Sequence, residues 1–154
     1  MMLYEIVKTV HILSATVLFG TGLGTAWFMW RADCSGDAAA VAATARNVVL
    51  ADWLFTTPAI ILQPLTGLWL IFLGGYSSAE TWLLWTYGLY LLAGACWLPV
   101  VWLQIRMRDL ATMAVANGAP LSARYRRYAR LWFALGWPAF IAVILIVYLM
   151  VAKY

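Results

Sequence analysis

LWFALGWPAFIAVILIVYLMVA (Leu131–Ala152) is a run of 22 residues without a formal charge. Three more stretches share this property when His11 is counted as neutral: Thr9–Trp30 with 22 residues, Trp53–Ala79 with 27 and Thr81–Ile105 with 25. A helix needs about 20 apolar residues to cross the roughly 30 Å hydrocarbon layer of a bilayer. The sequence therefore predicts four membrane-spanning helices.

The composition excludes an ordinary soluble domain. Of the 154 residues, 66% are apolar and 10% are charged, whereas about a quarter of the residues of a soluble domain are charged. We expect a single transmembrane domain with spans at about residues 6–30, 49–74, 82–105 and 131–152. Because the connections are short, sequential helices should run antiparallel, and the expected fold is an all-α, up-down-up-down four-helix bundle in a lipid bilayer. No nucleic-acid partner is expected.

Basic residues predict the orientation of this bundle. The loops after the first and third spans hold eight arginines: Arg31, Arg46, Arg106, Arg108, Arg124, Arg126, Arg127 and Arg130. The opposite side holds two lysines, Lys8 and Lys153. Lysine and arginine accumulate in cytoplasmic loops, so we expect both termini on the periplasmic side.

His11 is the only histidine, and with this orientation it lies about two turns inside the outer face of the first span. Ionisable residues within a membrane are costly and mark candidate functional sites. An imidazole can hold haem iron as an axial ligand or carry a proton; the structural alternative is a hydrogen bond to a neighbouring helix. Glu5 and Lys8 precede His11 at three-residue steps, so the three residues form either a proton-handling group or a solvated helix end.

Aromatic residues begin the third span on the same outer side. Trp85, Tyr87 and Tyr90 are candidates for the wall of a cofactor site beside His11. A pocket for a flat ligand, such as a porphyrin or a quinone, is one interpretation of the many tryptophans, and core packing is the other.

The second span combines a proline kink with polar side chains. Pro64 cannot donate a backbone hydrogen bond, which frees the carbonyl of Ile60 one turn earlier. Gln63 can bond across the bundle, and Thr66 adds a hydroxyl to the same span. Gln63, Pro64 and Thr66 are therefore the candidate residues for lining a cavity.

Two further features also have structural and functional interpretations. Gly20 and Gly24 form a GxxxG pattern, which allows close packing of helices or the close approach of a ligand ring. Asp52 is the carboxylate embedded in the second span. We expect it to form an interfacial ion pair with Arg46 or with the arginines of the third loop; a proton relay is the alternative.

Several motifs resemble those of a known family. They are VKTVHILSA at residues 7–15, GTG at 20–22, TPA at 57–59, QPLTG at 63–67, GACWLPVVWLQ at 94–104 and GWP at 136–138. Together they resemble the bacterial integral-membrane family called DUF2269, a domain of unknown function. The resemblance covers nearly the whole chain. It implies a four-helix fold in the bacterial inner membrane and does not imply an activity.

The start of the first span bears a second, weaker resemblance. Lys8 to His11, followed by a helix rich in small residues, is similar to the small membrane protoporphyrinogen oxidase and to copper-resistance membrane proteins. In the former, a histidine near the beginning of the first helix is associated with haem, which implies that His11 is the metal ligand here. The lysine and the further histidines expected there have no counterpart in the third span of this chain.

Two functions of different classes follow from these patterns. The first is an inner-membrane protein that binds haem or another flat redox cofactor near the outer face, with His11 as the contact residue. The second is a non-enzymatic accessory or scaffold subunit that packs against a partner membrane protein or a second copy. Transport through a kinked bundle is a third interpretation, and it would need oligomerisation because four helices make a thin pathway.

Overall fold

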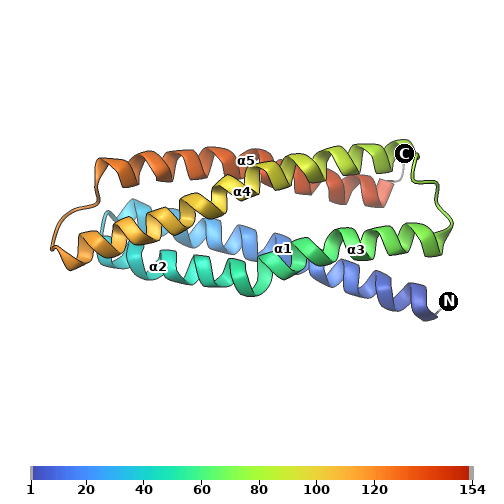
Figure 1. The fold of residues 1–154 in the computed structure, drawn as a ribbon, viewed down its shortest axis with the longest axis horizontal. Coiled ribbons are helices and arrows are strands. Elements are labelled where there is room, and N and C mark those ends of the chain that lie inside the picture. The colour runs from blue at the N-terminus through green and yellow to red at the C-terminus, as the bar shows by residue number, and fades with distance from the viewer. Residues whose placement is uncertain (1, 153–154) are drawn as a thin grey trace.

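The structure is a computed structural model that describes residues 2–152, and every element in that range is a helix. The elements are α1 (Met2–Ser35), α2 (Ala38–Ala51), the π-helical turn η1 (Asp52–Thr56), α3 (Thr57–Gly74), α4 (Thr81–Ala116) and α5 (Ala123–Ala152). α2, η1 and α3 follow one another without a break, so the chain forms four long helices (Figure 1). Each is long and apolar enough to cross a membrane, which confirms the prediction of four long apolar helices.

The helices are longer than a bilayer requires. α4 has 36 residues, which is about 54 Å at 1.5 Å per residue, whereas the hydrocarbon layer is about 30 Å thick. α4 continues to Ala116 and α5 begins at Ala123, well outside the spans predicted at 82–105 and 131–152. The additional turns carry most of the arginines, so we expect this end of the bundle to extend beyond the hydrocarbon layer.

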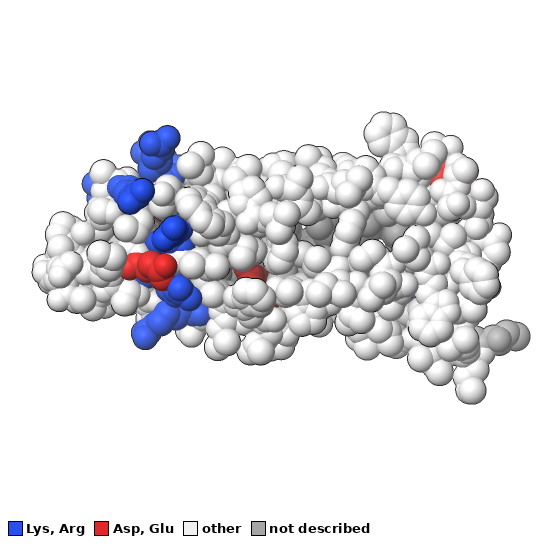
Figure 2. All heavy atoms as spheres, viewed as in Figure 1, with Lys and Arg blue, Asp and Glu red and all other residues white. Residues whose placement is uncertain are grey.

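The four helices alternate in direction along the bundle (Figure 1). The α1–α2 and α4–α5 turns lie at one end. The helix ends at Met2 and Ala152 lie at the other end, together with the α3–α4 connection. Figure 2 shows the basic side chains gathered near the end that holds the α1–α2 and α4–α5 turns. We call this the basic end.

Local capping explains where two helices begin at the basic end. The Asp37 carboxylate accepts a hydrogen bond from the backbone N–H of Ala39 at 2.9 Å, and the Ser122 hydroxyl accepts one from Tyr125 at 3.2 Å. Such caps satisfy amide groups that have no partner within their own helix. Gly36 precedes the first cap with a φ of 68°, a left-handed conformation that favours glycine.

The buried core lies in the half of the bundle near the basic end. It joins α1, α2, α4 and α5, and its most buried members include Val41, Met107, Ala111 and Tyr125. Further from the basic end, α1 packs along α3 and α4 packs along α5, while contacts between these two helix pairs are sparse. The bundle is therefore tightly packed at its basic end and loosely joined at the opposite end.

A tyrosine satisfies the carbonyl that Pro64 leaves free. Pro64 lies inside α3, and its missing N–H deprives the carbonyl of Ile60 of its helical partner. The Tyr90 hydroxyl of α4 donates a hydrogen bond to the Ile60 carbonyl at 2.6 Å. This bond compensates for the proline and also links the two helix pairs. Tyr90 thus has a structural role, and its role as the wall of a cofactor site stays a prediction.

Tyr90→Phe is expected to lower the free energy of unfolding by about 1–3 kcal/mol, because the Ile60 carbonyl loses its donor within the bilayer region. In a Pro64→Ala background the same substitution should cost less, since the restored backbone N–H can reach that carbonyl. Denaturation in detergent followed by circular dichroism would measure both costs. Tyr148→Phe is the control, because Tyr148 is exposed. An equal cost of Tyr90→Phe in both backgrounds would contradict the compensation.

Candidate functional site

His11 lies on α1 and faces α3. Its ring nitrogen Nδ1 is 2.7 Å from the hydroxyl oxygen of Thr66. That hydroxyl oxygen is also 2.6 Å from the carbonyl oxygen of Leu62, one turn earlier on α3. A hydroxyl has one hydrogen to donate, and the Leu62 carbonyl can only accept it. We therefore assign the tautomer in which Nδ1 of His11 donates to Thr66 and Nε2 carries the free lone pair.

Gln63 reaches from α3 to α1 beside His11. Its amide nitrogen donates to the backbone carbonyl of His11 at 2.9 Å and to the hydroxyl of Ser14. Ser14 also donates to the His11 carbonyl, at 3.0 Å. The prediction that Gln63 bonds across the bundle is confirmed. We call His11, Ser14, Gln63 and Thr66 the α1–α3 polar cluster.

Gly67 leaves the room that the imidazole occupies. A Cβ atom at this position would lie 3.4 Å from Cε1 of His11, so a larger side chain would press on the ring. Sequence patterns do not single out Gly67 or Ser14, because small residues in an apolar helix are usually explained by helix packing. The sequence feature that could have identified Gly67 is its position directly after Thr66, in the motif QPLTG.

The charged residues predicted at the mouth of the site do not pair with each other. Glu5 and Lys8 are both exposed. The one ion pair found in residues 2–152 lies elsewhere. The structure therefore favours a solvated helix end at this point, with Lys8 free to meet a group from outside the chain.

The aromatic residues predicted to wall the site are spread over different environments. Trp85 is mostly exposed, whereas Tyr87 is partly buried. The Tyr87 hydroxyl is buried without a hydrogen-bond partner in the described part of the chain. Since Tyr90 pairs with Ile60 on an antiparallel helix, Tyr87 lies one turn further from the basic end, at about the level of Gln63.

His11 stands alone as a strong nitrogen ligand. Among residues 2–152, no group of three His, Cys, Asp or Glu side chains is placed to hold a metal ion. A caged ion such as Zn²⁺ needs three or four protein ligands. A single imidazole with a fixed tautomer suits one axial bond to haem iron instead.

Gly20 and Gly24 face open space. Apart from neighbours on their own helix, no atom of the described chain lies within 4 Å of a Cβ built at either position. These glycines therefore do not bring two helices of this chain into close contact. If these glycines pack closely against a helix, that helix would belong to a second copy or to a partner protein. Their role in packing stays a prediction.

Asp52 does not form the ion pair predicted for it. It is buried at the start of η1, where its carboxylate accepts a hydrogen bond from the Thr56 hydroxyl at 2.8 Å and interacts with the Gln104 side chain of α4. The ion pair seen in residues 2–152 joins Arg108 and Asp109. The prediction was wrong because Asp52 lies buried between the helices, whereas Arg46 is exposed and the Arg106 guanidinium lies over the Trp102 ring.

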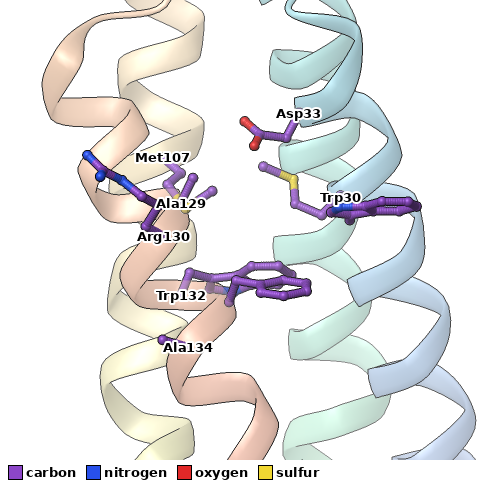
Figure 3. Close-up of a pocket in the computed structure, with 9 residues that line it drawn as sticks. Trp30, Asp33, Met107, Ala129, Arg130, Trp132 and Ala134 are labelled. Carbon is purple, nitrogen blue, oxygen red and sulfur yellow. The ribbon is translucent and has the colours of Figure 1, made fainter.

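Two cavities lie on the side of the bundle near the basic end. The first, of about 270 Å³, is lined by residues of α1, α4 and α5. Figure 3 shows Trp132 extending from α5 across this space, with Asp33 of α1 pointing into it. The second, of about 320 Å³, lies between α4 and the continuous helix of α2, η1 and α3. Its lining includes Asp52, Gln104 and three tryptophans, Trp53, Trp97 and Trp102.

The chain also matches a known protein family. A family model described as "Predicted integral membrane protein (DUF2269)" matches residues 5–154. The match extends over all four long helices. No curated protein and no solved structure matches the chain. The comparisons thus identify a membrane protein and assign no chemistry to the α1–α3 polar cluster.

Thr66→Val is expected to lower the free energy of unfolding by about 1–3 kcal/mol, because it leaves the Nδ1–H of His11 without its acceptor. Thr16→Val is the matched control: Thr16 is exposed, and its hydroxyl bonds to the Ile12 carbonyl of its own helix. Thermal unfolding in detergent would compare the two variants. Equal losses would argue against a role of the His11–Thr66 bond in joining α1 to α3.

Proposed function

Because the chain belongs to the DUF2269 family of integral membrane proteins, we propose that it acts within the bilayer, by binding haem or another flat redox cofactor through Nε2 of His11. The observation that carries this proposal is the hydrogen bond between Nδ1 of His11 and the Thr66 hydroxyl. Metal-binding histidines commonly donate their other ring N–H to a protein oxygen, which fixes the tautomer and the orientation of the ring. This arrangement leaves Nε2 as the nitrogen available to iron.

The half of the bundle that holds His11 is also the more open half. Contacts between the α1–α3 and α4–α5 pairs are sparse there, and Figure 2 shows the visible face hollowed away from the basic end. A polar group of a bound ligand would give the buried Tyr87 hydroxyl the partner that it lacks within the described chain. Lys8, one turn from His11, would pair with a propionate at the outer mouth.

One imidazole gives haem one protein ligand from each chain. Bound haem would supply one-electron redox chemistry, and the protein would supply the axial nitrogen and the apolar surroundings. The residues of this chain would bind the cofactor, orient it and limit the access of water. A second histidine ligand would have to come from another copy or from a partner protein, because His11 is the only histidine. Otherwise a ligand of another type or an open position would complete the site.

The alternative function is a non-enzymatic accessory or scaffold subunit. The α1–α3 polar cluster is consistent with a scaffold subunit, because its hydrogen bonds hold α1 to α3 without any cofactor. Gly20 and Gly24 favour it as well, since their surface meets no other part of the described chain. Faces of small residues allow transmembrane helices of different chains to pack closely. The partner would be a second copy or another membrane protein.

We further propose that the protein lies in the bacterial inner membrane with both termini in the periplasm. The eight loop arginines against two lysines support this orientation. The basic end in Figure 2 would then face the cytoplasm, where arginines near anionic headgroups each contribute about 1 kcal/mol of attraction.

Protein produced with ample haem precursor and purified in mild detergent should show a Soret band, and His11→Ala should remove it. Lys8→Ala should reduce haem retention less, because an ammonium would pair only with a propionate. Thr16→Val, on an exposed residue of the same helix, should keep the wild-type spectrum. Circular dichroism would confirm that each variant is folded. A wild-type protein that stays colourless would exclude haem and favour the accessory subunit.

Reporter fusions test the orientation. A fusion at Tyr154 should report the periplasm, and one inserted within residues 117–120 should report the cytoplasm, because the Lys and Arg residues are distributed eight to two. Alkaline phosphatase and a fluorescent protein that folds in the cytoplasm would serve as the two reporters. A cytoplasmic signal at Tyr154 would reverse the orientation and move His11 to the inner face.

A further inference from the structure

The second cavity holds a buried carboxylate without a cationic partner. Asp52 and Gln104 both line it, and each has 6% of its surface exposed. The carboxylate accepts a hydrogen bond from the Thr56 hydroxyl, and no lysine or arginine among residues 2–152 forms an ion pair with it. A carboxylate within a membrane is costly unless it is protonated or meets a cation. When ionised, this carboxylate therefore needs a cation from outside the described chain.

The unpartnered polar atom in this cavity is a hydrogen-bond acceptor. Oε1 of Gln104 is buried and has no hydrogen-bond partner in the described part of the chain. The Gln104 amide N–H is the group that can bond to the Asp52 carboxylate, so Oε1 is the acceptor left over in a cavity that both side chains line. Two acceptors side by side call for a ligand that donates hydrogen bonds.

Tryptophans form the walls around these acceptors. The faces of Trp53, Trp97 and Trp102 can attract a cation through their ring electrons. The Arg106 guanidinium already lies 5.5 Å from the centroid of the Trp102 ring, which holds it at this ring, without an ion pair to Asp52. Trp53 and Trp102 are about half exposed, so the cavity opens at the surface of the bundle, within the predicted spans.

We propose that this cavity binds a small lipophilic ammonium ion that enters from the bilayer. Its N–H groups donate to the Asp52 carboxylate and to Oε1 of Gln104, and its apolar body lies against the tryptophans. The cavity volume of about 320 Å³ falls at the lower end of ligand pockets, which hold about 300–1,000 Å³, and suits a molecule of one or two rings. His11 takes no part in this site, so the proposal is independent of haem binding.

Two other kinds of molecule could occupy the second cavity, and each meets only part of its requirements. A neutral apolar molecule would fill the space but leave the carboxylate uncompensated. The ammonium of a phosphatidylethanolamine headgroup carries the right donors on a bulkier body. Asp52 and Gln104 lie buried between helices, where a small amine reaches them more readily than a headgroup attached to a glycerol backbone.

Titration calorimetry of the purified protein in a neutral detergent tests the proposal. The probe is 1-naphthylmethylammonium, and neutral 1-naphthalenemethanol is the comparison ligand. We expect saturable 1:1 binding of the ammonium and about ten-fold weaker binding of the alcohol, because the alcohol makes no charge-assisted hydrogen bond. Asp52→Asn should weaken ammonium binding about ten-fold, and Gln104→Leu should also weaken it. Asp33→Asn is the matched control, since Asp33 lines the other cavity, and it should bind like the wild type.

Several results would overturn the proposal. They are equal binding of the alcohol and the ammonium, unchanged binding by Asp52→Asn, or an equal loss in Asp33→Asn. If Asp52→Asn does not fold, Gln104→Leu and the alcohol comparison decide the question. Nanodiscs of phosphatidylcholine with and without phosphatidylethanolamine provide the last comparison. Loss of probe binding only where phosphatidylethanolamine is present would assign the cavity to a lipid headgroup instead.

Discussion

Water is absent from the hydrocarbon core of a bilayer, so every backbone polar group there needs a partner within the protein. This constraint is clearest at Pro64, where the Ile60 carbonyl would be left alone if Tyr90 of another helix did not donate to it. Threonine hydroxyls obey the same constraint by returning to carbonyls of their own helix: Thr9, Thr16, Thr25 and Thr86 all do so. Thr66 does this and also accepts from His11. Most polar side chains of the spans thus form hydrogen bonds within the protein. The groups available for binding or chemistry are those that these bonds leave without a partner.

The polar atoms that lack a hydrogen-bond partner differ between the two ends of the bundle. Near the basic end, where α1, α2, α4 and α5 pack tightly, the second cavity retains acceptors, namely the Asp52 carboxylate and Oε1 of Gln104. In the loosely joined half, the α1–α3 polar cluster retains an imidazole nitrogen, and Tyr87 retains a phenol hydroxyl. Acceptors suit a cationic donor, whereas an imidazole nitrogen suits a metal centre. One small bundle therefore presents two distinct chemical environments at different depths of the membrane.

Local rules made some of these features predictable. Charge-free length predicted the four helices, and the missing N–H of Pro64 identified the Ile60 carbonyl as free, but which donor would reach it depends on how α4 is placed. Gln63 was correctly expected to bond across the bundle because long polar side chains in an apolar span have few other partners. The ion pair expected for Asp52 was wrong because the charge-free length that predicts a span gives no sign of a π turn within it. The GxxxG pattern likewise does not specify a partner, and the glycine that closely approaches His11 is Gly67.

The π turn at Asp52–Thr56 has a consequence for both ends of the molecule. A π turn contains one residue more than an α turn, and one residue corresponds to about 100° of rotation around a helix axis. The extra residue therefore sets the rotational phase of α3 relative to α2. With a regular α turn in its place, the face of α3 that carries Gln63 and Thr66 would swing away from His11. Asp52 begins this turn, so a residue that lines the second cavity also stands where the orientation of the Gln63 and Thr66 face is set.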